Sequence, residues 1–534
     1  MFKNALTQDV AYESLLTPRR QAVHAAAGSA MERLYPDWLA EHYEALAHHF
    51  TLGTVWEKAF DYLTKSGDKA RQAYANQEAV AFYTHAIEVR GRITPPLEDA
   101  QLLPVYEGRG LSGAWLLHYD AAIADFQMMH QIAHASGNFY KEGDSLCHLA
   151  QVYLSKSPGD HIAFVEQYAQ EAMHLFDHTR DPYIQTRSLS SLGLVDQDRG
   201  NLLDAERHFE EAVRISRQEG FQDNLAQALA HLTSVAYWQG HFSRVVQLSQ
   251  EGLMVARALH DGSSELRDLA NLCLACWSAG HYTQARTVLQ EGMAKAIERE
   301  SKSIIGRLMN TRGWFYRECG DISRAVAYDQ ESLELGRTYS VGNVEVSACI
   351  NLGLDALALG QQARALSYLE PTLDRVVREA FGAHRWRWQI RLLIGLAELS
   401  YTTGDYDQAL RTVEVGLHEA QRTSSQKYVA LGWALRGKII AKLGDADTAG
   451  TELQRAFSLA DQLQSPSLLY PIVYDLGQWH ESTGKEREAA ALYGKAKATI
   501  AQMATAVEDD ALRSTFLQSA LVQEIHERAA RLGE

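Results

Sequence analysis

Residues 351–366 read NLGLDALALGQQARAL, and residues 395–410 follow the same pattern as GLAELSYTTGDYDQAL. In both, a leucine stands eight residues before a central glycine and an alanine stands five residues after it. The central glycine recurs across more than half of the chain in steps of 40 residues, with one step of 44, at Gly200, Gly240, Gly280, Gly320, Gly360, Gly404, Gly444 and Gly484. A fixed spacing of this length indicates an array of like structural units.

Other columns keep the same register. Small residues stand twelve positions after most of these glycines, and a further glycine often stands seven positions before. Bulky side chains stand nine positions after, at Phe209, Leu289, Leu369, Leu453 and Tyr493. Each central glycine is suited to end a helix in the left-handed conformation, and small residues let two helices approach closely. Each unit is therefore a helical hairpin that must stack on its neighbours to bury its apolar face, and the chain is predicted to be all-α.

These columns resemble the tetratricopeptide repeat (TPR) family, in a variant with a longer period than the usual 34 residues and without the usual closing proline. The resemblance implies a right-handed superhelical solenoid. Weaker copies with origins near Tyr74, Leu117 and Asp160 extend the array toward the N-terminus. We expect about 11–12 units over residues 51–500, followed by a helical cap over residues 501–534.

Residues 1–50 do not fit the period and are predicted to form a separate helical segment. The residues Phe2, 5–8, 10–16 and His24, continued by residues 46–50, 56–63 and 74–80, resemble a connector in bacterial signalling proteins. In those proteins it joins a STAND-type AAA ATPase, combined with an adenylate/guanylate cyclase or a kinase, to a TPR tail. The resemblance covers only their C-terminal part, and its start at Phe2 suggests that an output domain has been lost or is encoded separately.

Composition excludes several classes of function. The chain has 534 residues and a net charge of −16, a poor basis for contacting nucleic-acid phosphates. Its five cysteines fit a reducing compartment. The sequence contains no run of about 18 apolar residues and no secretory signal pattern. We expect a cytoplasmic protein that binds neither membrane nor nucleic acid directly and needs no cofactor or metal.

Several short matches to catalytic or metal motifs fail on their context. A GxGxxG at residues 108–113, a near P-loop at residues 432–438 and the start of a hydrolase motif at residues 143–146 all fall within predicted helices rather than after strands. Cys273 and Cys276 occupy helix-packing positions. The histidine pairs 130/134 and 174/178 lack a carboxylate at fixed spacing. The sequence therefore predicts no enzyme.

The TPR resemblance also implies where a partner would bind. In that family the first helix of each hairpin lines a concave groove. The matching positions of this chain are unusually rich in side chains that dominate protein interfaces: Arg187, Tyr237, Trp238, Arg267, Trp277, Arg307, Asn310, Trp314 and Arg317. Such a groove favours an acidic or C-terminal peptide segment. The alternative is structural, with tryptophan filling wide hairpins and arginine stems covering apolar surface.

A second cluster, HRWRW at residues 384–388 with Arg391, occupies the 44-residue step and is either a contact surface or helix-start packing. The main hypothesis is a non-catalytic scaffold or sensor that binds a protein or peptide and regulates an ATPase, cyclase or kinase output. The alternatives are a fragment of such an enzyme and the sensor arm of a LuxR-like regulator. The sequence does not predict the oligomeric state.

Overall fold

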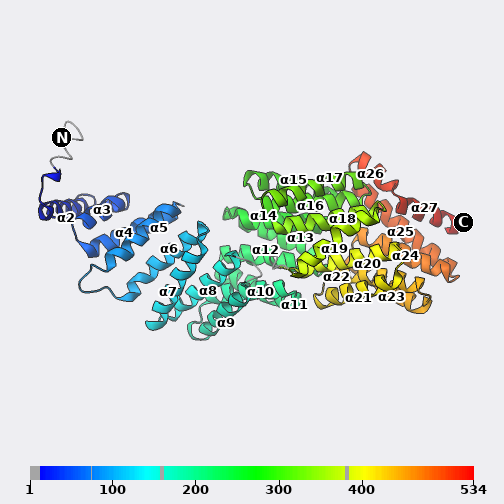
Figure 1. Ribbon diagram of the computed structural model, residues 1–534, viewed down its shortest axis with the longest axis horizontal. Coiled ribbons are helices and arrows are strands. Elements are labelled where there is room, and N and C mark those ends of the chain that lie inside the picture. The colour runs from blue at the N-terminus through cyan, green and yellow to red at the C-terminus, as the bar shows by residue number, and fades with distance from the viewer. Residues whose placement is uncertain (1–11, 74, 157–160, 379–383, 534) are drawn as a thin grey trace. The chain divides into compact units, whose positions relative to one another are not determined.

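The computed structural model describes residues 12–533, apart from residue 74 and the segments 157–160 and 379–383. Within this part of the chain the regular structure consists of α-helices and two short 3-10 helices, with no strand. Consecutive helices pack against each other as antiparallel hairpins (Figure 1). The predicted fold class, an all-α solenoid of helical hairpins, is confirmed. The predicted landmarks at residues 2–11, Tyr74 and Asp160 lie outside the described residues.

The chain divides into two compact units, residues 1–191 and 192–534. The division falls inside one helix, and the boundaries predicted at residues 50 and 500 stay predictions. The helices up to the division are α2 (Thr17–Leu34), η1 (Pro36–His42), α3 (Tyr43–Leu52), α4 (Trp56–Gln72), α5 (Asn76–Arg90), η2 (Asp99–Leu102), α6 (Leu103–Trp115), α7 (Tyr119–Ala135), α8 (Phe139–Lys156), α9 (Ile162–Thr179) and α10 (Pro182–Arg199).

The second unit contains the strict 40-residue repeat. Its helices after α10 are α11 (Leu202–Glu219), α12 (Gln222–Trp238), α13 (Phe242–Ala258), α14 (Gly262–Ser278), α15 (Tyr282–Glu298), α16 (Lys302–Glu318), α17 (Ile322–Thr338), α18 (Gly342–Ala358), α19 (Gln362–Arg378), α20 (Trp386–Thr402), α21 (Tyr406–Arg422), α22 (Gln426–Lys442), α23 (Ala446–Leu463), α24 (Pro466–Ser482), α25 (Glu486–Ala506), α26 (Asp510–Leu517) and α27 (Ala520–Gly533). The even-numbered helices from α10 to α24 are the first helices of their hairpins, and we call them the inner helices.

The central glycine of each repeat lies in the turn between the two helices of its hairpin. From Gly200 to Gly484 all eight have positive φ angles, between +69° and +96°. L-residues with a Cβ rarely adopt this conformation, so the strictest column of the sequence follows from the backbone of this turn.

The glycine column seven positions before the turn faces the bulky column nine positions after it. A Cβ placed on Gly193 would lie 2.8 Å from the Phe209 ring, and one on Gly477 would lie 2.6 Å from the Tyr493 ring. Phe209 and Tyr493 are fully buried. The two columns therefore form one packing device, in which a large side chain occupies the space left by the missing Cβ.

The second unit curls until repeats far apart in the sequence touch. The Arg422 guanidinium donates to the carbonyl oxygen of Arg199 (3.0 Å), and the Thr283 hydroxyl donates to that of Ala506 (3.4 Å). Both pairs are separated by 223 residues. Residues of the inner helices α12, α14, α16, α18, α20 and α22 line one common cavity.

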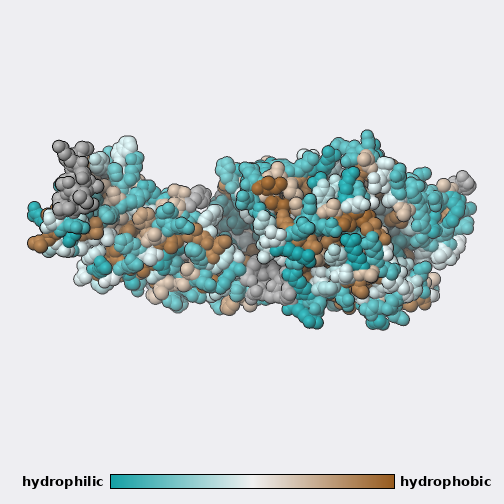
Figure 2. All heavy atoms as spheres, turned by 45° about the horizontal axis from the view of Figure 1, so that its top comes forward, coloured by the Kyte–Doolittle hydropathy of each residue, from teal (hydrophilic) through white to brown (hydrophobic). Residues whose placement is uncertain are grey.

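The last helix closes the array over its exposed end. Val522 and Ile525 of α27 are fully buried in the same hydrophobic cluster as Tyr493 and Ile500 of α25. The predicted cap over residues 501–534 stays a prediction. The outer face drawn in Figure 2 is mostly hydrophilic, with separate hydrophobic patches, because the apolar faces lie between the helices.

Candidate functional site

A central cavity of about 150 Å³ lies among six inner helices of the second unit. The residues that line it share the inward face of their helices, at spacings of three or four positions that bring side chains to one side. They are Ser234, Tyr237, Trp238, Asn271, Leu274, Arg307, Asn310, Thr311, Trp314, Asn343, Val344, Ser347, Asn351, Arg387, Trp388, Arg391 and Tyr428.

Five of the nine partner-binding residues predicted from the sequence meet at this cavity, namely Tyr237, Trp238, Arg307, Asn310 and Trp314. They come from α12 and α16, which are separated along the chain by one complete hairpin. The curl of the unit therefore brings them together. Their role in binding stays a prediction.

The other four predicted residues are engaged within the fold. Trp277 is 5% exposed and donates through Nε1 to Glu318 (2.6 Å). Arg317 forms an ion pair with Asp355 (2.9 Å), and Arg267 contacts the His231 ring nitrogen (2.6 Å). The fourth, Arg187, lies in the first unit.

The second sequence cluster divides between the cavity and its wall. Arg387, Trp388 and Arg391 line the cavity beside the residues of α16. Trp386 instead packs edge-on against Trp238, with ring centroids 5.1 Å apart, and its Nε1 donates to the Gln197 carbonyl oxygen (2.9 Å). Packing therefore accounts for Trp386, and a contact surface formed by the other three residues stays a prediction.

Sequence reasoning missed the polar residues on α14 and α18 and the aromatic residue on α22. Asn271, Asn343, Ser347 and Asn351 carry no distinctive signal, and Tyr428 stands among ordinary helix residues. The signal that could have found them is their register, since Asn343, Ser347 and Asn351 are spaced by four positions on one helix.

Aromatic and cationic contacts narrow the cavity. The Trp238 and Tyr428 rings stack with centroids 5.8 Å apart, and the Lys427 ammonium lies 3.9 Å from the centroid of the Trp314 ring. The same ammonium is 3.7 Å from Glu318. Helices α12, α16 and α22 therefore meet at this site, and their side chains leave a space for a small group.

The charged side chains that line the cavity are all positive. Three guanidinium groups line it, and its lining contains no carboxylate. Burial first, and then the charge of Arg267, lower the pKa of Arg307 to about 10. Burial, with the charges of Arg307 and Arg391, lowers the pKa of Arg387 to about 9.

A larger and more apolar cavity of about 500 Å³ lies on the other side of α16. Its walls come from α14, α15, α16 and the stretch from the end of α25 into α26, with Trp277, Leu289, Phe315, Val507 and Leu512 among them. Trp277 therefore faces this second cavity and not the central one.

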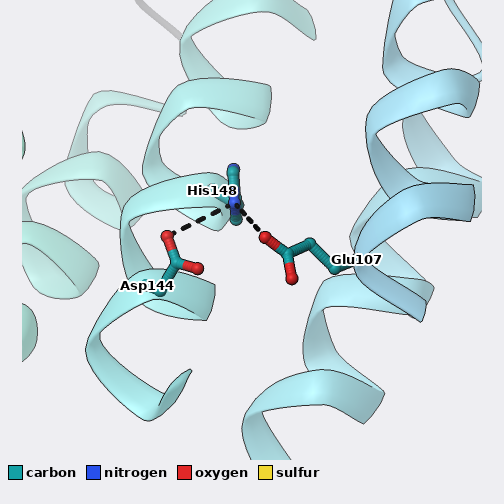
Figure 3. Close-up of side chains that lie close together, drawn as sticks. All are labelled: Glu107, Asp144 and His148. Atoms are coloured by element: carbon teal, nitrogen blue, oxygen red, sulfur yellow. Dashed lines mark ion pairs between the residues drawn. The ribbon is translucent and has the colours of Figure 1, made fainter. Parts of the chain in front are cut away.

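In the first unit, Glu107, Asp144 and His148 are the one group of three His, Cys or acidic side chains, among the described residues, close enough to hold a metal (Figure 3). Their negative charge is already balanced. Lys141 Nζ is 2.7 Å from Glu107, and Arg187 Nη1 is 2.8 Å from Asp144. A divalent cation would face both of these charges, so the group fits a structural ion network better than a metal site.

The same network sets the protonation of its members. Burial, followed by the charge of Arg187, lowers the pKa of His148 to about 3. Burial raises the pKa of Asp144, but contacts with the His148 ring, the Arg187 guanidinium and the Lys141 ammonium outweigh it and hold that pKa below its usual value. Arg187 therefore has a structural function in this unit, and a further role in partner binding stays a prediction.

The short catalytic and metal matches all lie in helices. Residues 108–113 are in α6, 143–146 in α8 and 432–438 in α22. Cys273 and Cys276 are buried in α14, and burial raises the pKa of each thiol to about 12, which disfavours the reactive thiolate.

Comparison with known proteins identifies the repeat type. Tetratricopeptide repeat models match residues 186–219 and 390–414. The chain therefore contains TPR repeats, and such repeats are generally non-catalytic modules for protein interaction. No curated protein matches the sequence.

Three solved structures are similar to the chain at low sequence identity. The first is the APC/C hetero-tetramer Cut9–Hcn1, with 13% identity and a TM-score of 0.44, covering 97% of this chain and 98% of that one. The second is a Rap protein complexed with Competence and Sporulation Factor, with 13% identity and a TM-score of 0.40, covering 76% and 99%. The third is BtubC from P. vanneervenii, with 16% identity and a TM-score of 0.29, covering 40% and 91%. Among the described residues, no helix combines the length and apolarity needed to cross a membrane.

Proposed function

We propose that the chain is a non-catalytic interaction module whose second unit binds a protein or peptide partner through its inner helices. The observation that carries the proposal is the meeting of Tyr237, Trp238, Arg307, Asn310 and Trp314 at one cavity. Tryptophan, tyrosine and arginine dominate the binding energy of protein interfaces. The TPR repeats support the class of function.

The volume of the cavity limits how much of a partner it can hold. About 150 Å³ admits a few atoms rather than an extended peptide. A partner would therefore insert one side chain or its chain end into the cavity, and the remainder would contact the surrounding surface or require the curl to open.

The test compares two double variants of the full chain. Trp314→Ala with Asn343→Ala changes the cavity lining, while Arg411→Ala with Val415→Ala changes exposed positions on α21 as the matched control. Partners captured from the source lysate by the wild-type chain are identified by mass spectrometry and titrated against all three proteins. We expect at least a tenfold loss of affinity for the cavity variant alone, after circular dichroism shows that it folds.

A partner that binds the cavity variant as tightly as wild type would place the binding surface elsewhere and refute the proposal. Hydrolysis of ATP or formation of a cyclic nucleotide by the purified chain would favour the alternative of an enzyme fragment. A salt-sensitive shift of duplex DNA would favour the regulator alternative.

We also propose that the N-terminal segment connects the module to an ATPase, cyclase or kinase output. The residues of the connector resemblance support this because they gather in one place. The Tyr12 hydroxyl is 3.0 Å from His24 Nε2, and His24 Nδ1 is 2.9 Å from His49 Nδ1. If the proposal holds, His24→Ala weakens binding of such an output protein and leaves binding at the central cavity unchanged.

A further inference from the structure

Arginines in this protein usually face a carboxylate, and those of the central cavity are exceptional. Arg109 pairs with Asp125, Arg187 with Asp144 and Arg317 with Asp355. In the cavity, Arg307 Nη2 instead donates to the Asn271 side-chain oxygen (2.6 Å), and Arg391 Nη2 donates to that of Asn351 (2.5 Å). The partners are neutral amides, which orient the guanidinium groups without cancelling their charge.

Of the three arginines that line the cavity, Arg387 has the fewest interactions to compensate its buried guanidinium group. Its guanidinium carbon lies over the Trp388 ring, 4.5 Å from the ring centroid, and its buried Nε has no hydrogen-bond partner among the described residues. A buried donor without a partner costs free energy that a ligand can recover.

The carboxylates near the cluster are each held by another group. Asp198 lies near Arg387, but its Oδ1 accepts the backbone N–H of His384 (2.7 Å), and burial raises its pKa. Asp329 lies behind Asn351, whose Nδ2 donates to it (2.8 Å). Burial, followed by the charge of Asp355, raises the pKa of Asp329 well above its usual value.

We propose that Arg307, Arg387 and Arg391 form a binding site for an oxyanion, a carboxylate or phosphate group carried by the ligand. Guanidinium forks match such groups with paired hydrogen bonds. The volume of about 150 Å³ suits a group of this size. Asn310 supplies a buried side-chain oxygen with no partner, which accepts a hydrogen bond from a hydroxyl or N–H next to the anion.

The site lies in the cavity of the proposed function and rests on it, because the anion is the part of the ligand that enters. Its residues come from α16 and α20, which are separated by one complete hairpin. An anion between them replaces repulsion among three cations with attraction, so binding stabilises the curled unit. Burial, followed by the charges of Arg307 and Arg391, lowers the pKa of Arg387, which agrees with this repulsion.

Thermal unfolding of the full chain tests the site at constant ionic strength, with chloride as the reference salt. The probes are inorganic phosphate, N-acetylglycine as a chain-end carboxylate, and N-acetylglycinamide as its uncharged counterpart. We expect the melting temperature to rise saturably with phosphate, N-acetylglycine or both, and to stay constant with the amide. A response to phosphate alone identifies a phosphate ligand, and a response to N-acetylglycine alone identifies a carboxylate ligand.

Two variants locate the effect. Arg387→Gln with Arg391→Gln abolishes the anion response, and without anion it melts no lower than wild type, because the substitution relieves repulsion. Arg307→Gln alone weakens the response by at least tenfold in anion concentration. Arg411→Gln, at an exposed position of α21, leaves it unchanged.

Two results overturn the inference, namely no anion response in the wild-type chain or an undiminished response in the arginine variants. Neither refutes the proposed function, which fails instead when the Trp314→Ala, Asn343→Ala variant keeps full affinity for the identified partner. If that partner binds the arginine variants as tightly as wild type while the Trp314 variant loses it, the groove binds a partner without an anion site.

Discussion

His148 is a buried histidine that stays uncharged at neutral pH although it lies among charged groups. It is 8% exposed, and Arg187 Nη2 lies 3.1 Å from its Nδ1. The second cation near it is Lys141, and the facing carboxylates are Asp144 and Glu107. Burial and the charge of Arg187 together outweigh the attraction of the Asp144 carboxylate, so the neutral ring is the stable form.

This residue makes the stability of the chain depend on pH. The pKa of His148 is about 3 in the folded chain and 6.5 when unperturbed. Between these values the unfolded chain binds a proton that the folded chain does not, so stability falls as the pH falls below 6.5. From pH 7 to pH 5 the loss from one such group is about 2 kcal/mol.

We predict that His148→Asn removes this part of the pH dependence while keeping an acceptor for Arg187. The variant should lose about 2 kcal/mol less unfolding free energy than wild type between pH 7 and pH 5. Urea unfolding followed by circular dichroism at both pH values measures the difference. An equal loss in both proteins would show that His148 is protonated in the folded chain.

At the scale of helices, each hairpin depends on a glycine that admits a large side chain from its partner helix. Gly477 on α24 faces Tyr493 on α25, whose hydroxyl donates to Glu481 (2.8 Å). Directly after Tyr493, Gly494 is exposed on α25, and a Cβ there would meet no atom within 4 Å. Substituting alanine at each of these two glycines therefore distinguishes the effect of packing from the effect of helix propensity.

We predict that Gly477→Ala costs about 1–3 kcal/mol of unfolding free energy, because the added Cβ would force the Tyr493 ring to move. Gly494→Ala should be neutral or stabilise by up to about 1 kcal/mol, since alanine favours the helix. Urea midpoints of the two variants make the comparison. Equal effects in the same direction would contradict the packing argument.

The turns that follow the second helices repeat with the same period, although the sequence does not show it. Arg180, His260, Glu300, Ser340, His384, Ser424 and Gln464 all have positive φ angles, with Gly220 as the glycine of the series. Because different residue types occupy these positions, the column is invisible in the sequence. The packed helices impose the positive φ angle at these positions, whatever residue type occupies them.

In the second unit as a whole, contacts between repeats far apart in the sequence stabilise the curled arrangement of the helices. Trp386 donates to the Gln197 carbonyl oxygen (2.9 Å) and packs on Trp238. Trp479 donates in the same way to the Ala446 carbonyl oxygen (2.9 Å), within neighbouring helices. The two tryptophans make like hydrogen bonds at very different sequence separations.

We predict that Trp386→Phe speeds amide hydrogen exchange in residues 197–201 and 384–391, because it removes a bond that joins distant repeats. Trp479→Phe, the matched control, should leave those two segments unchanged. Mass spectrometry of peptic peptides reads both regions. Unchanged exchange in the Trp386 variant would show that the remaining contacts alone hold the curl.

The sequence by itself determined the hairpin repeat, because the turn glycines and the paired small and bulky columns express contacts within about 40 residues. It did not determine the site. Tyr237, Trp277 and Arg317 occupy the same position of their repeats, yet one lines the central cavity, one is buried against Glu318 and one pairs with Asp355. The curl decides which inner residues meet, and it accumulates from small rotations between successive hairpins. Only the tertiary structure therefore brought Arg387 and Arg391 beside Arg307.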